Sequence, residues 1–239
     1  MQTESLDNFC IDPDYRTASG IIEPDQTSNY DWSEGRVKSS VYYQYHVYQE
    51  ALKLIMTSKL GSVIDIGCGP GVKLMEMLNP AGIDAVGIDQ KEAIQICTSR
   101  YPEGEFYVDN FDSPSLSLDR TFDLIICADV IEHVANPDLL LSYVRDHAHL
   151  GSHIILSTPE RDRLRGKGCT FSPKREHIRE WNSQEFVNYL ESRSLVIEEH
   201  RIVPKLKWNL KEYYKMLKRP LKFRGQLMSC QMAICRLAD

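Results

Sequence analysis

The sequence predicts an α/β protein with a mostly parallel sheet of seven strands and helices on both faces. Three observations predict this fold. Apolar runs of strand length recur along the chain, helical patterns lie between most of them, and the first run ends in a glycine-rich turn. Strands that alternate with helices favour a parallel sheet, because each right-handed crossover returns the chain to the same end of the sheet.

The expected strands are apolar runs at 62–66, 85–88, 105–108, 122–128, 153–157, 195–203 and 230–237. Helical periodicity covers 72–78, 92–100, 137–149 and 183–193. Residues 33–58 read as one or two further helices ahead of the sheet, with an aromatic face. That face either packs on the sheet or forms a lid over a ligand cleft, and the pattern alone leaves both interpretations open.

The length of 239 residues fits one domain at 31–239, preceded by a polar and partly disordered leader at 1–30. The apolar runs are too short to span a bilayer, and the N-terminus lacks the pattern of a signal peptide, so we expect a cytoplasmic location. Seven cysteines occur without a C-x-x-C pair, which indicates reduced thiols. No convincing set of metal ligands is evident, and we predict no metal site.

The net charge of −6 argues against general nucleic-acid binding, but positive charge is concentrated in two segments. The first follows the fifth expected strand, and the second is an insertion at 204–228 with eight Lys or Arg and one acid. These segments either attract an anionic acceptor or are solvated surfaces. Aromatic residues interleave with the basic ones in the insertion, so a peripheral membrane contact through 204–228 is a further possibility. The basic residues of the first segment are Arg161, Arg163, Arg165, Lys167, Lys174, Arg175 and Arg179.

The turn after the first strand has the sequence VIDIGCGPG, residues 63–71. Glycines at 67, 69 and 71 permit positive φ and let backbone N–H groups approach a ligand near the following helix. The crevice beyond the carboxyl ends of parallel strands is where such sheets bind small ligands. The turn therefore predicts a ligand site.

The second strand ends in Asp89, eighteen residues after Gly71, close to the spacing of an acid that accepts hydrogen bonds from ribose hydroxyls. We therefore expect a ligand that contains a nucleoside. The spacing D-x-G-x-G-x-G differs from the G-x-G-x-x-G of nicotinamide-binding folds, and Asp65 suits a ligand with a positive end better than a pyrophosphate.

These segments, together with 107–110 and "FDLIICADVIEHVANP" at 122–137, resemble the class I S-adenosylmethionine-dependent methyltransferases. The chain is most similar to the small-molecule branch, which includes ubiquinone, sugar and antibiotic O- and N-methyltransferases. The resemblance implies the Rossmann-like methyltransferase fold, whose last strand is inserted antiparallel, and S-adenosylmethionine as the cofactor.

The resemblance also implies roles for individual residues. Backbone around Gly67, Cys68 and Gly69 would contact the amino-acid part of the cofactor, with Asp65 fixing the loop or acting through a water. Asp89 would bind the ribose hydroxyls. Asp109 would bind the adenine amino group with Asn110 and Phe111 alongside, although Asp112 could substitute for it. The carbonyl of Cys127 or Ala128 would face the ammonium group. The remaining cofactor-binding position is Gly71.

Methyl transfer to a hydroxyl requires alignment of the acceptor and removal of its proton. Glu132 and His133 follow the fourth strand, and His177 follows the fifth, so these three are the candidate catalytic residues. Each also has a plain structural interpretation, as a helix start or a loop anchor. Oxygen is favoured over nitrogen, because the position after the fourth strand reads ADVI and lacks the Asn/Asp-Pro-Pro-aromatic tetrapeptide of enzymes that act on planar nitrogens.

The expected function is methyl transfer from S-adenosylmethionine to a hydroxyl of a small-molecule or saccharide acceptor, with an anionic acceptor favoured. Three alternatives stay open: an N-methyltransferase, an RNA or protein methyltransferase, and a cofactor-binding partner subunit without catalysis.

Overall fold

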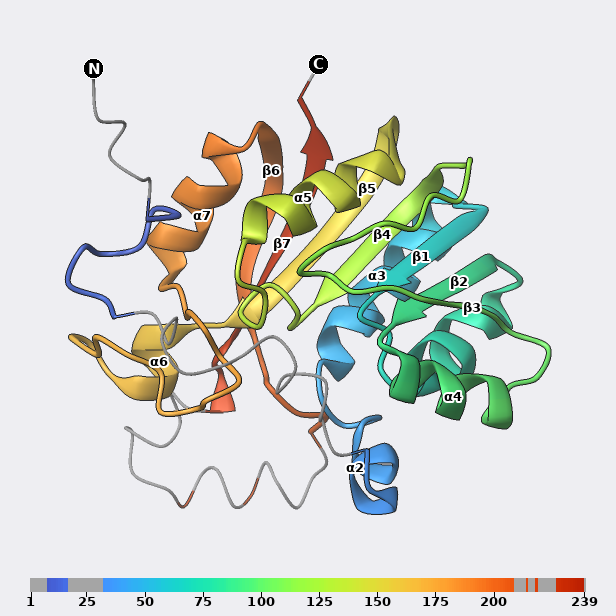
Figure 1. The fold of residues 1–239 in the computed structure, drawn as a ribbon, viewed down its shortest axis with the longest axis horizontal. Helices are drawn as coiled ribbons and strands as arrows, with labels where there is room; N and C mark the ends of the chain where they lie inside the picture. The colour runs from blue at the N-terminus through green and yellow to red at the C-terminus, as the bar shows by residue number, and fades with distance from the viewer. Residues whose placement is uncertain (1–7, 17–31, 209–213, 215–217, 219–226, 239) are drawn as a thin grey trace.

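The computed structural model describes residues 8–16, 32–208, 214, 218 and 227–238 (Figure 1). Its centre is a seven-stranded sheet in the order β3-β2-β1-β4-β5-β7-β6. The first five strands pair in parallel, and β7 is antiparallel to both of its neighbours. The predicted fold class is confirmed. The strands are β1 (Ser62–Ile66), β2 (Asp84–Asp89), β3 (Glu105–Val108), β4 (Phe122–Ala128), β5 (Ala148–Pro159), β6 (Leu195–Val203) and β7 (Cys230–Leu237).

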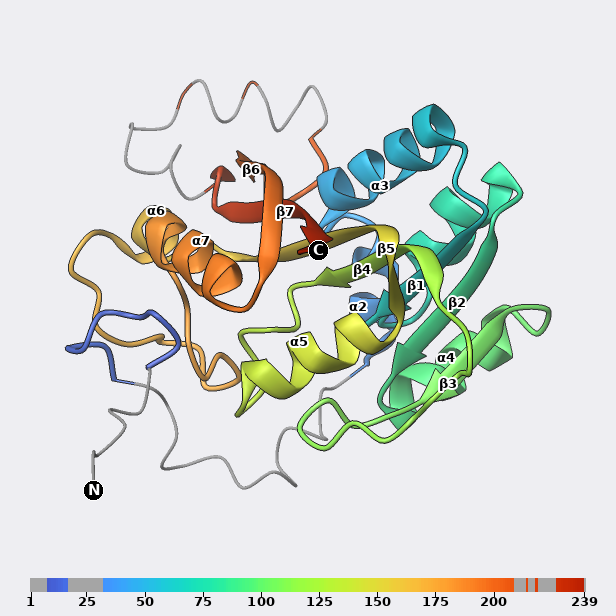
Figure 2. The ribbon, with the colours of Figure 1, turned by 90° about the horizontal axis from the view of Figure 1, so that it is seen from above.

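Helices cover both faces of the sheet (Figure 2). On one face lie α3 (Tyr45–Ser58) and the π-helix η1 (Leu74–Leu78), and on the other lie α5 (Pro137–Asp146) and α7 (Ser183–Ser192). Helix α4 (Lys91–Arg100) packs against β2 and β3. The shorter helices are α2 (Glu34–Ser39), η2 (Asn79–Ala81) and α6 (Arg161–Arg165).

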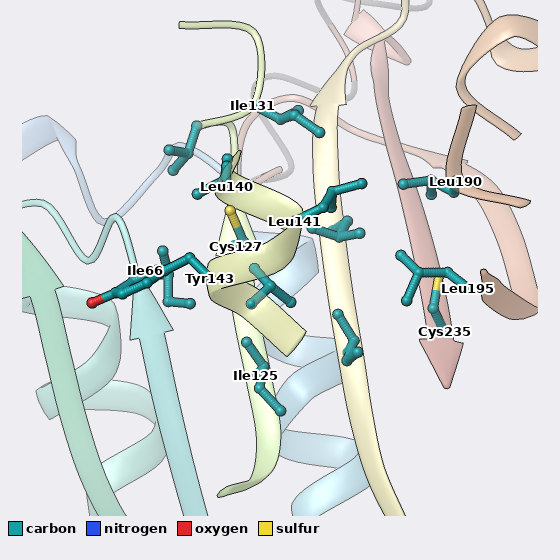
Figure 3. Close-up of a cluster of buried hydrophobic side chains, with 14 of the residues drawn as sticks. Ile66, Ile125, Cys127, Ile131, Leu140, Leu141, Tyr143, Leu190, Leu195 and Cys235 are labelled. Atoms are coloured by element: carbon teal, nitrogen blue, oxygen red, sulfur yellow. The ribbon is translucent and has the colours of Figure 1, made fainter. Parts of the chain in front are cut away.

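The two faces follow from the period of two along each strand. Val63 of β1 and Leu124 of β4 pack in the cluster under α3, whereas the next residues, Ile64 and Ile125, pack in the cluster under α5. Figure 3 shows the second cluster, with Cys127 of β4 facing the side chains of α5. Strands buried on both faces explain why their sequences are continuously apolar.

The boundary between the fifth strand and the helix before it differs from the expectation. The helix expected at 137–149 ends at Asp146, and the strand expected at 153–157 extends from Ala148 to Pro159. The early start has a local cause: Ala148 pairs with Phe122 of β4, and Ser152 Oγ donates a hydrogen bond to the Phe122 carbonyl. At its other end, α5 begins as expected, with the Asn136 side chain accepting from the Asp138 N–H.

Part of the expected leader packs against the domain. Ile11 and Tyr15 are buried in the main core. Trp181 Nε1 donates to the Phe9 carbonyl, and the Glu180 N–H donates to the Tyr15 hydroxyl oxygen. The rest of the leader and most of the insertion at 204–228 lie outside the described residues, so the membrane contact expected there stays a prediction. Among the described helices, none has the length and apolar character needed to cross a bilayer.

Candidate functional site

The sheet order changes direction between β1 and β4, because the chain runs from β1 to β2 and β3 on one side and to β4 and β5 on the other. Ligand crevices of open parallel sheets form at such a point, beyond the carboxyl ends of the strands. Here the turns after β1 and β4 touch: a Cβ added at Gly67 would lie 2.2 Å from Cγ2 of Val130. The glycine loop and the expected catalytic segment are therefore neighbours.

The glycine loop has the backbone that its sequence predicts. Gly67, Gly69 and Gly71 have φ of 86°, 57° and 71°, in the region that only glycine adopts readily. The N–H groups of Gly67 and Cys68 donate to the Ile88 carbonyl of β2, which ties the loop to the neighbouring strand. The ring of Trp32 lies against Gly69, with a distance of 3.0 Å to an added Cβ. Trp32 was not among the predicted site residues, since one tryptophan outside any periodic pattern carries no local signal.

Asp89 joins the end of β2 to the glycine loop. Its Oδ2 accepts from the Gly69 N–H at 2.7 Å, and its Oδ1 accepts from the Gln90 N–H at 2.7 Å. Burial raises the pKa of Asp89 to about 6, despite these hydrogen bonds. The structure thus brings the expected ribose acid and the loop together, 20 residues apart in sequence.

Asp65 lies beneath the loop and is fully buried. Tyr48 of α3 donates its hydroxyl hydrogen to Asp65 Oδ2 at 2.7 Å, while Oδ1 has no hydrogen-bond partner among the residues that the structure describes. Burial raises the pKa of Asp65 to about 7. Tyr48 therefore belongs to the packed side of the aromatic helix, and Asp65 is positioned by a side chain of that helix.

Lys73 is a second buried charge near the loop that the sequence did not reveal. Its Nζ donates to the Ser40 carbonyl at 3.2 Å and lies 4.9 Å from the centre of the Tyr48 ring. Burial lowers the pKa of Lys73, while the negative charge of Asp65 acts in the opposite direction. The sequence signal for this group was a lysine within the helical pattern at 72–78. Burying its ammonium group is costly without nearby negative charge, which points to an acid close by.

Asp109 holds the loop that follows β3. Its carboxylate accepts hydrogen bonds from the N–H groups of Asn110, Ser115 and Leu116 at 2.8 to 3.2 Å. Phe111 is buried and packs near the ring of Tyr143. The adenine contacts that the resemblance implies for these residues stay predictions.

Asp112 is occupied elsewhere: its Oδ1 accepts from the Ala135 N–H at 2.6 Å, which links the loop after β3 to the turn before α5.

The fourth strand ends in Cys127 and Ala128, which are both buried, and the next residue is strained. Asp129 has φ of 55°, unusual for a residue with a side chain. Its carboxylate accepts from Ser157 Oγ at 2.8 Å and from Gln44 Nε2 at 2.9 Å. Such strain persists where neighbouring contacts enforce it, and it is common at functional sites.

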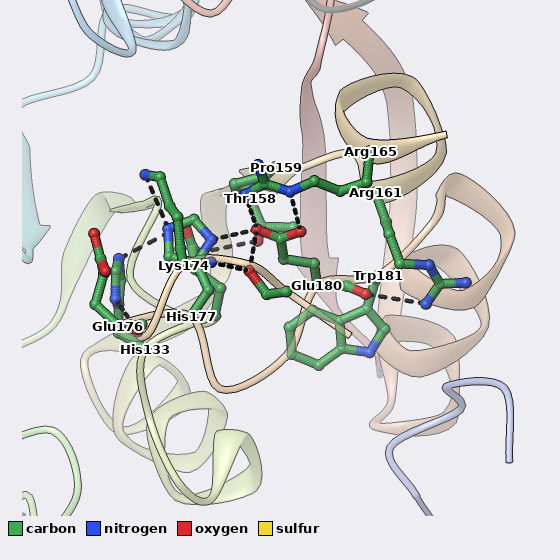
Figure 4. Close-up of polar contacts among 12 residues, drawn as sticks. His133, Thr158, Pro159, Arg161, Arg165, Lys174, Glu176, His177, Glu180 and Trp181 are labelled. Carbon is green, nitrogen blue, oxygen red and sulfur yellow. Dashed lines mark hydrogen bonds and ion pairs between the residues drawn. The ribbon is translucent and has the colours of Figure 1, made fainter. Parts of the chain in front are cut away.

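The three candidate catalytic side chains come together beyond β4 and β5. Figure 4 shows the two histidines, His133 and His177, side by side. One donor atom each from Glu132, His133 and His177 lies within 4.8 Å of the others. The rings of the two histidines meet edge to face at 4.8 Å between centroids. The two histidines are 44 positions apart in the sequence, with all of α5 and β5 between them.

Burial disfavours the charged forms of His133 and Glu132 in this cluster. Burial lowers the pKa of His133 to about 4, and the nearby His177 adds to the effect. Burial raises the pKa of Glu132 well above its ordinary value, and the charge of Asp129 acts in the same direction. Burial also raises the pKa of Glu180, but hydrogen bonds from Arg165 and His177 outweigh it and lower that pKa to about 2.

Three of the basic residues expected to attract an anion are used inside the fold. Arg161 pairs with Glu185, Arg165 makes two hydrogen bonds to Glu180, and Arg179 donates to backbone carbonyls of the β4 turn. Their guanidinium groups are therefore structural, and the cationic surface is smaller than the sequence suggested.

Two ammonium groups remain near the cluster. Lys174 Nζ lies 3.4 Å from Nε2 of His177. Burial, reinforced by the charge of Lys174, lowers the pKa of Lys205.

A family model described as "Methyltransferase domain" matches residues 41–200. A ubiquinone biosynthesis O-methyltransferase of Aliivibrio fischeri is 31% identical over 108 residues, which are 42% of this chain and 44% of that protein. The match thus spans less than half the length of this curated relative.

Two solved structures share the fold. The complex between the Haloferax volcanii Trm112 methyltransferase activator and a putative methyltransferase has a TM-score of 0.66 at 15% identity, covering 91% of this chain and 98% of that one. The O-methyltransferase of a Brevibacillus brevis multienzyme, in complex with S-adenosyl-L-homocysteine, has a TM-score of 0.59 at 15% identity, covering 93% and 82%.

The family match covers two thirds of the chain and includes the glycine loop, Asp89 and the cluster beyond β4. Together with the strand order and the loop geometry, it shows that the chain belongs to the S-adenosylmethionine-dependent methyltransferase family.

Proposed function

We propose that the protein transfers the methyl group of S-adenosylmethionine to a hydroxyl of a small-molecule or saccharide acceptor. The observation that carries the proposal is the contact between the two turns at the switch point of the sheet. The glycine loop and Asp89 lie on one side, and the Glu132, His133 and His177 cluster lies on the other.

In the reaction, the acceptor oxygen attacks the methyl carbon, the carbon–sulfur bond breaks, and its electron pair returns to sulfur. The sulfonium becomes a neutral thioether, and the hydroxyl proton must leave. Glu132 and His133 lie in the turn that follows β4, and His177 packs against His133, so we assign these three proton-accepting groups to activation of the acceptor hydroxyl. Oxygen is favoured because the similar Aliivibrio protein is named an O-methyltransferase.

The acceptor is proposed to be anionic because of Lys174 and Lys205. Lys174 approaches His177 directly, and the two ammonium groups are close enough for the charge of one to lower the pKa of the other. Two like charges held close together are stabilised when an anion binds between them.

The test begins with calorimetric titration of S-adenosylmethionine and S-adenosylhomocysteine, followed by transfer of a labelled methyl group to hydroxyl acceptors read by mass spectrometry. A matched pair of probes is a dihydroxybenzoate and its methyl ester, which share the hydroxyl and differ in charge. We expect the acid to have the lower KM. Failure of both nucleosides to bind at millimolar concentration would overturn the proposal. Methylation confined to amine acceptors would overturn its oxygen part, and equal KM values for acid and ester would overturn its anionic part.

A further inference from the structure

We propose that Glu132, His133 and His177 bind one divalent transition-metal cation. The use of that cation in activating the acceptor hydroxyl rests on the proposed function, whereas the binding site itself does not. The donors are two imidazole nitrogens and one carboxylate oxygen, and they come from two segments that meet beyond the carboxyl ends of β4 and β5.

The histidine tautomers can be assigned from their partners. His133 Nδ1 lies 2.6 Å from the Glu176 carbonyl oxygen, and His177 Nδ1 lies 2.5 Å from Glu180 Oε1 (Figure 4). Both partners can only accept, so each Nδ1 carries a hydrogen, and Nε2 is the ring nitrogen left to bind an ion. Metal-binding histidines have this arrangement, in which a carbonyl or carboxylate holds one ring N–H and directs the other nitrogen to the ion.

Among the residues that the structure describes, no Lys or Arg side chain pairs with the Glu132 carboxyl. Its side chain is 1% exposed, and Oε2 accepts from Thr158 Oγ1 at 2.9 Å. Oε1 faces Nε2 of His133 at 3.9 Å, which is too far for a hydrogen bond. Burial disfavours the ionised form of Glu132, and a bound cation would offset that cost.

The backbone holds the two segments in register. The Ile178 N–H donates to the Glu132 carbonyl at 2.8 Å, and Arg179 donates to the Val134 and Ala135 carbonyls at 2.8 Å. The loop that carries His177 is thereby fixed to the turn that carries Glu132. A preorganised set of this kind reduces the conformational cost of binding an ion.

Two adjustments accompany binding. Ligands at about 2.1 Å from an ion lie roughly 3.4 Å from one another, so donors spread over as much as 4.8 Å must close by up to about 1.4 Å. Lys174 Nζ, at 3.4 Å from His177 Nε2, must also move away. Lys174 is half-exposed and has a flexible stem, so its head group can rotate into solvent.

The donor set selects the class of ion. Imidazole nitrogen favours Zn²⁺, Fe²⁺ and Co²⁺ over Mg²⁺, Ca²⁺ and Mn²⁺, which prefer oxygen ligands. Three protein donors leave a coordination position open, as in catalytic rather than structural sites. An acceptor hydroxyl at that position would have a lower pKa and would lose its proton to solvent more readily.

The test is a titration of untagged, chelator-treated protein with Co²⁺, followed by visible absorption and proton NMR. We expect one ion per chain. We also expect two hyperfine-shifted resonances that disappear in D₂O, from the two protonated Nδ1 atoms. If Co²⁺ does not bind, or binds without these exchangeable resonances, the proposed metal site is wrong.

Variants identify the donors. His133→Ala and Glu132→Gln should weaken Co²⁺ binding by at least about 100-fold, more than the loss typical of an outer-shell change. His149→Ala, at an exposed histidine whose Nε2 contacts Asp123, is the matched control and should leave Co²⁺ affinity unchanged. Lys174→Ala should strengthen binding, because it removes the competing cation. Unchanged affinity in the two donor variants, with circular dichroism like wild type, would overturn the assignment.

Calorimetry with S-adenosylhomocysteine in parallel separates the two proposals. Cofactor binding without Co²⁺ binding would overturn the metal site alone, and Co²⁺ binding without cofactor binding would overturn the proposed function alone.

Discussion

Replacing Asp65 with Asn should remove a loss of stability that the wild-type protein suffers as pH rises. The pKa of Asp65 is raised by burial to about 7 in the folded protein, whereas an unfolded aspartate ionises near 3.9. Between these values the unfolded chain has released its proton and the folded chain keeps it, so the free energy of unfolding falls as pH rises and levels off above pH 7. At 1.36 kcal/mol per unit, the fall from pH 5 to pH 7 is about 2.7 kcal/mol.

Asparagine has the shape of the protonated carboxyl and can still accept the Tyr48 hydrogen bond. Asp65→Asn should therefore match wild type below about pH 4, and its advantage in stability should grow by about 2 to 3 kcal/mol between pH 5 and pH 8. Urea unfolding followed by far-UV circular dichroism at pH 5, 6, 7 and 8 measures the difference, and subtraction removes the contributions of all other groups. An equal difference at pH 5 and pH 8 would refute the reasoning.

Asp123→Asn is a control of opposite sign. Partial burial raises the pKa of Asp123, but hydrogen bonds from the N–H groups of Gly61 and Ser62 outweigh it and lower the pKa overall. Its ionised form is stabilised by folding, so the variant should lose stability relative to wild type at pH above 4, and the loss should disappear as pH falls below the folded pKa.

Two further predictions concern the glycine loop and its acid. Gly67→Ala should destabilise the fold by more than the ~1 to 2 kcal/mol that a left-handed alanine costs, because its Cβ would meet Val130 Cγ2 at 2.2 Å. Adding Val130→Ala removes that clash and should restore all but the backbone strain, as measured by urea unfolding. Failure of the double variant to recover stability would contradict the packing argument. Asp89→Ala should weaken S-adenosylhomocysteine binding by roughly 10- to 150-fold, or about 1.5 to 3 kcal/mol. Asp84→Ala, at the opposite end of the same strand, is the control and should leave the affinity measured by calorimetry unchanged. Equal affinities for the two variants would contradict a role for Asp89 in binding the ribose.

The fold was predictable because its signals are local and repeated. Each buried strand is a short apolar run, and the run at 122–128 matches β4 residue for residue. The glycine loop was predictable for the same reason, since positive φ at Gly67, Gly69 and Gly71 is a property of those residues alone. Asp89 followed from its place at the end of a strand next to that loop.

The contacts that bring together the candidate catalytic side chains could not be predicted in this way. His177 approaches His133 only because Ile178 binds the Glu132 carbonyl, a contact across 46 residues. Arg161 and Arg165 looked like surface cations, because a sequence shows charge but does not show the buried carboxylate that each guanidinium meets. Charge near a cleft is therefore weak evidence for an anionic ligand until the partners of each cation are known.

The segment at 8–16 contributes both to the fold and to the position of the candidate catalytic cluster. Arg179 is buried with its guanidinium on backbone carbonyls, and burial lowers its pKa to about 10. Its charge is balanced in part by rings, since it lies 4.6 Å from the centre of Phe9 and 5.9 Å from that of Trp181. The Tyr15 hydroxyl in turn accepts from the backbone of Glu180. The N-terminal residues thus hold the loop that orients His177, and an apparently unstructured leader is part of what positions the site.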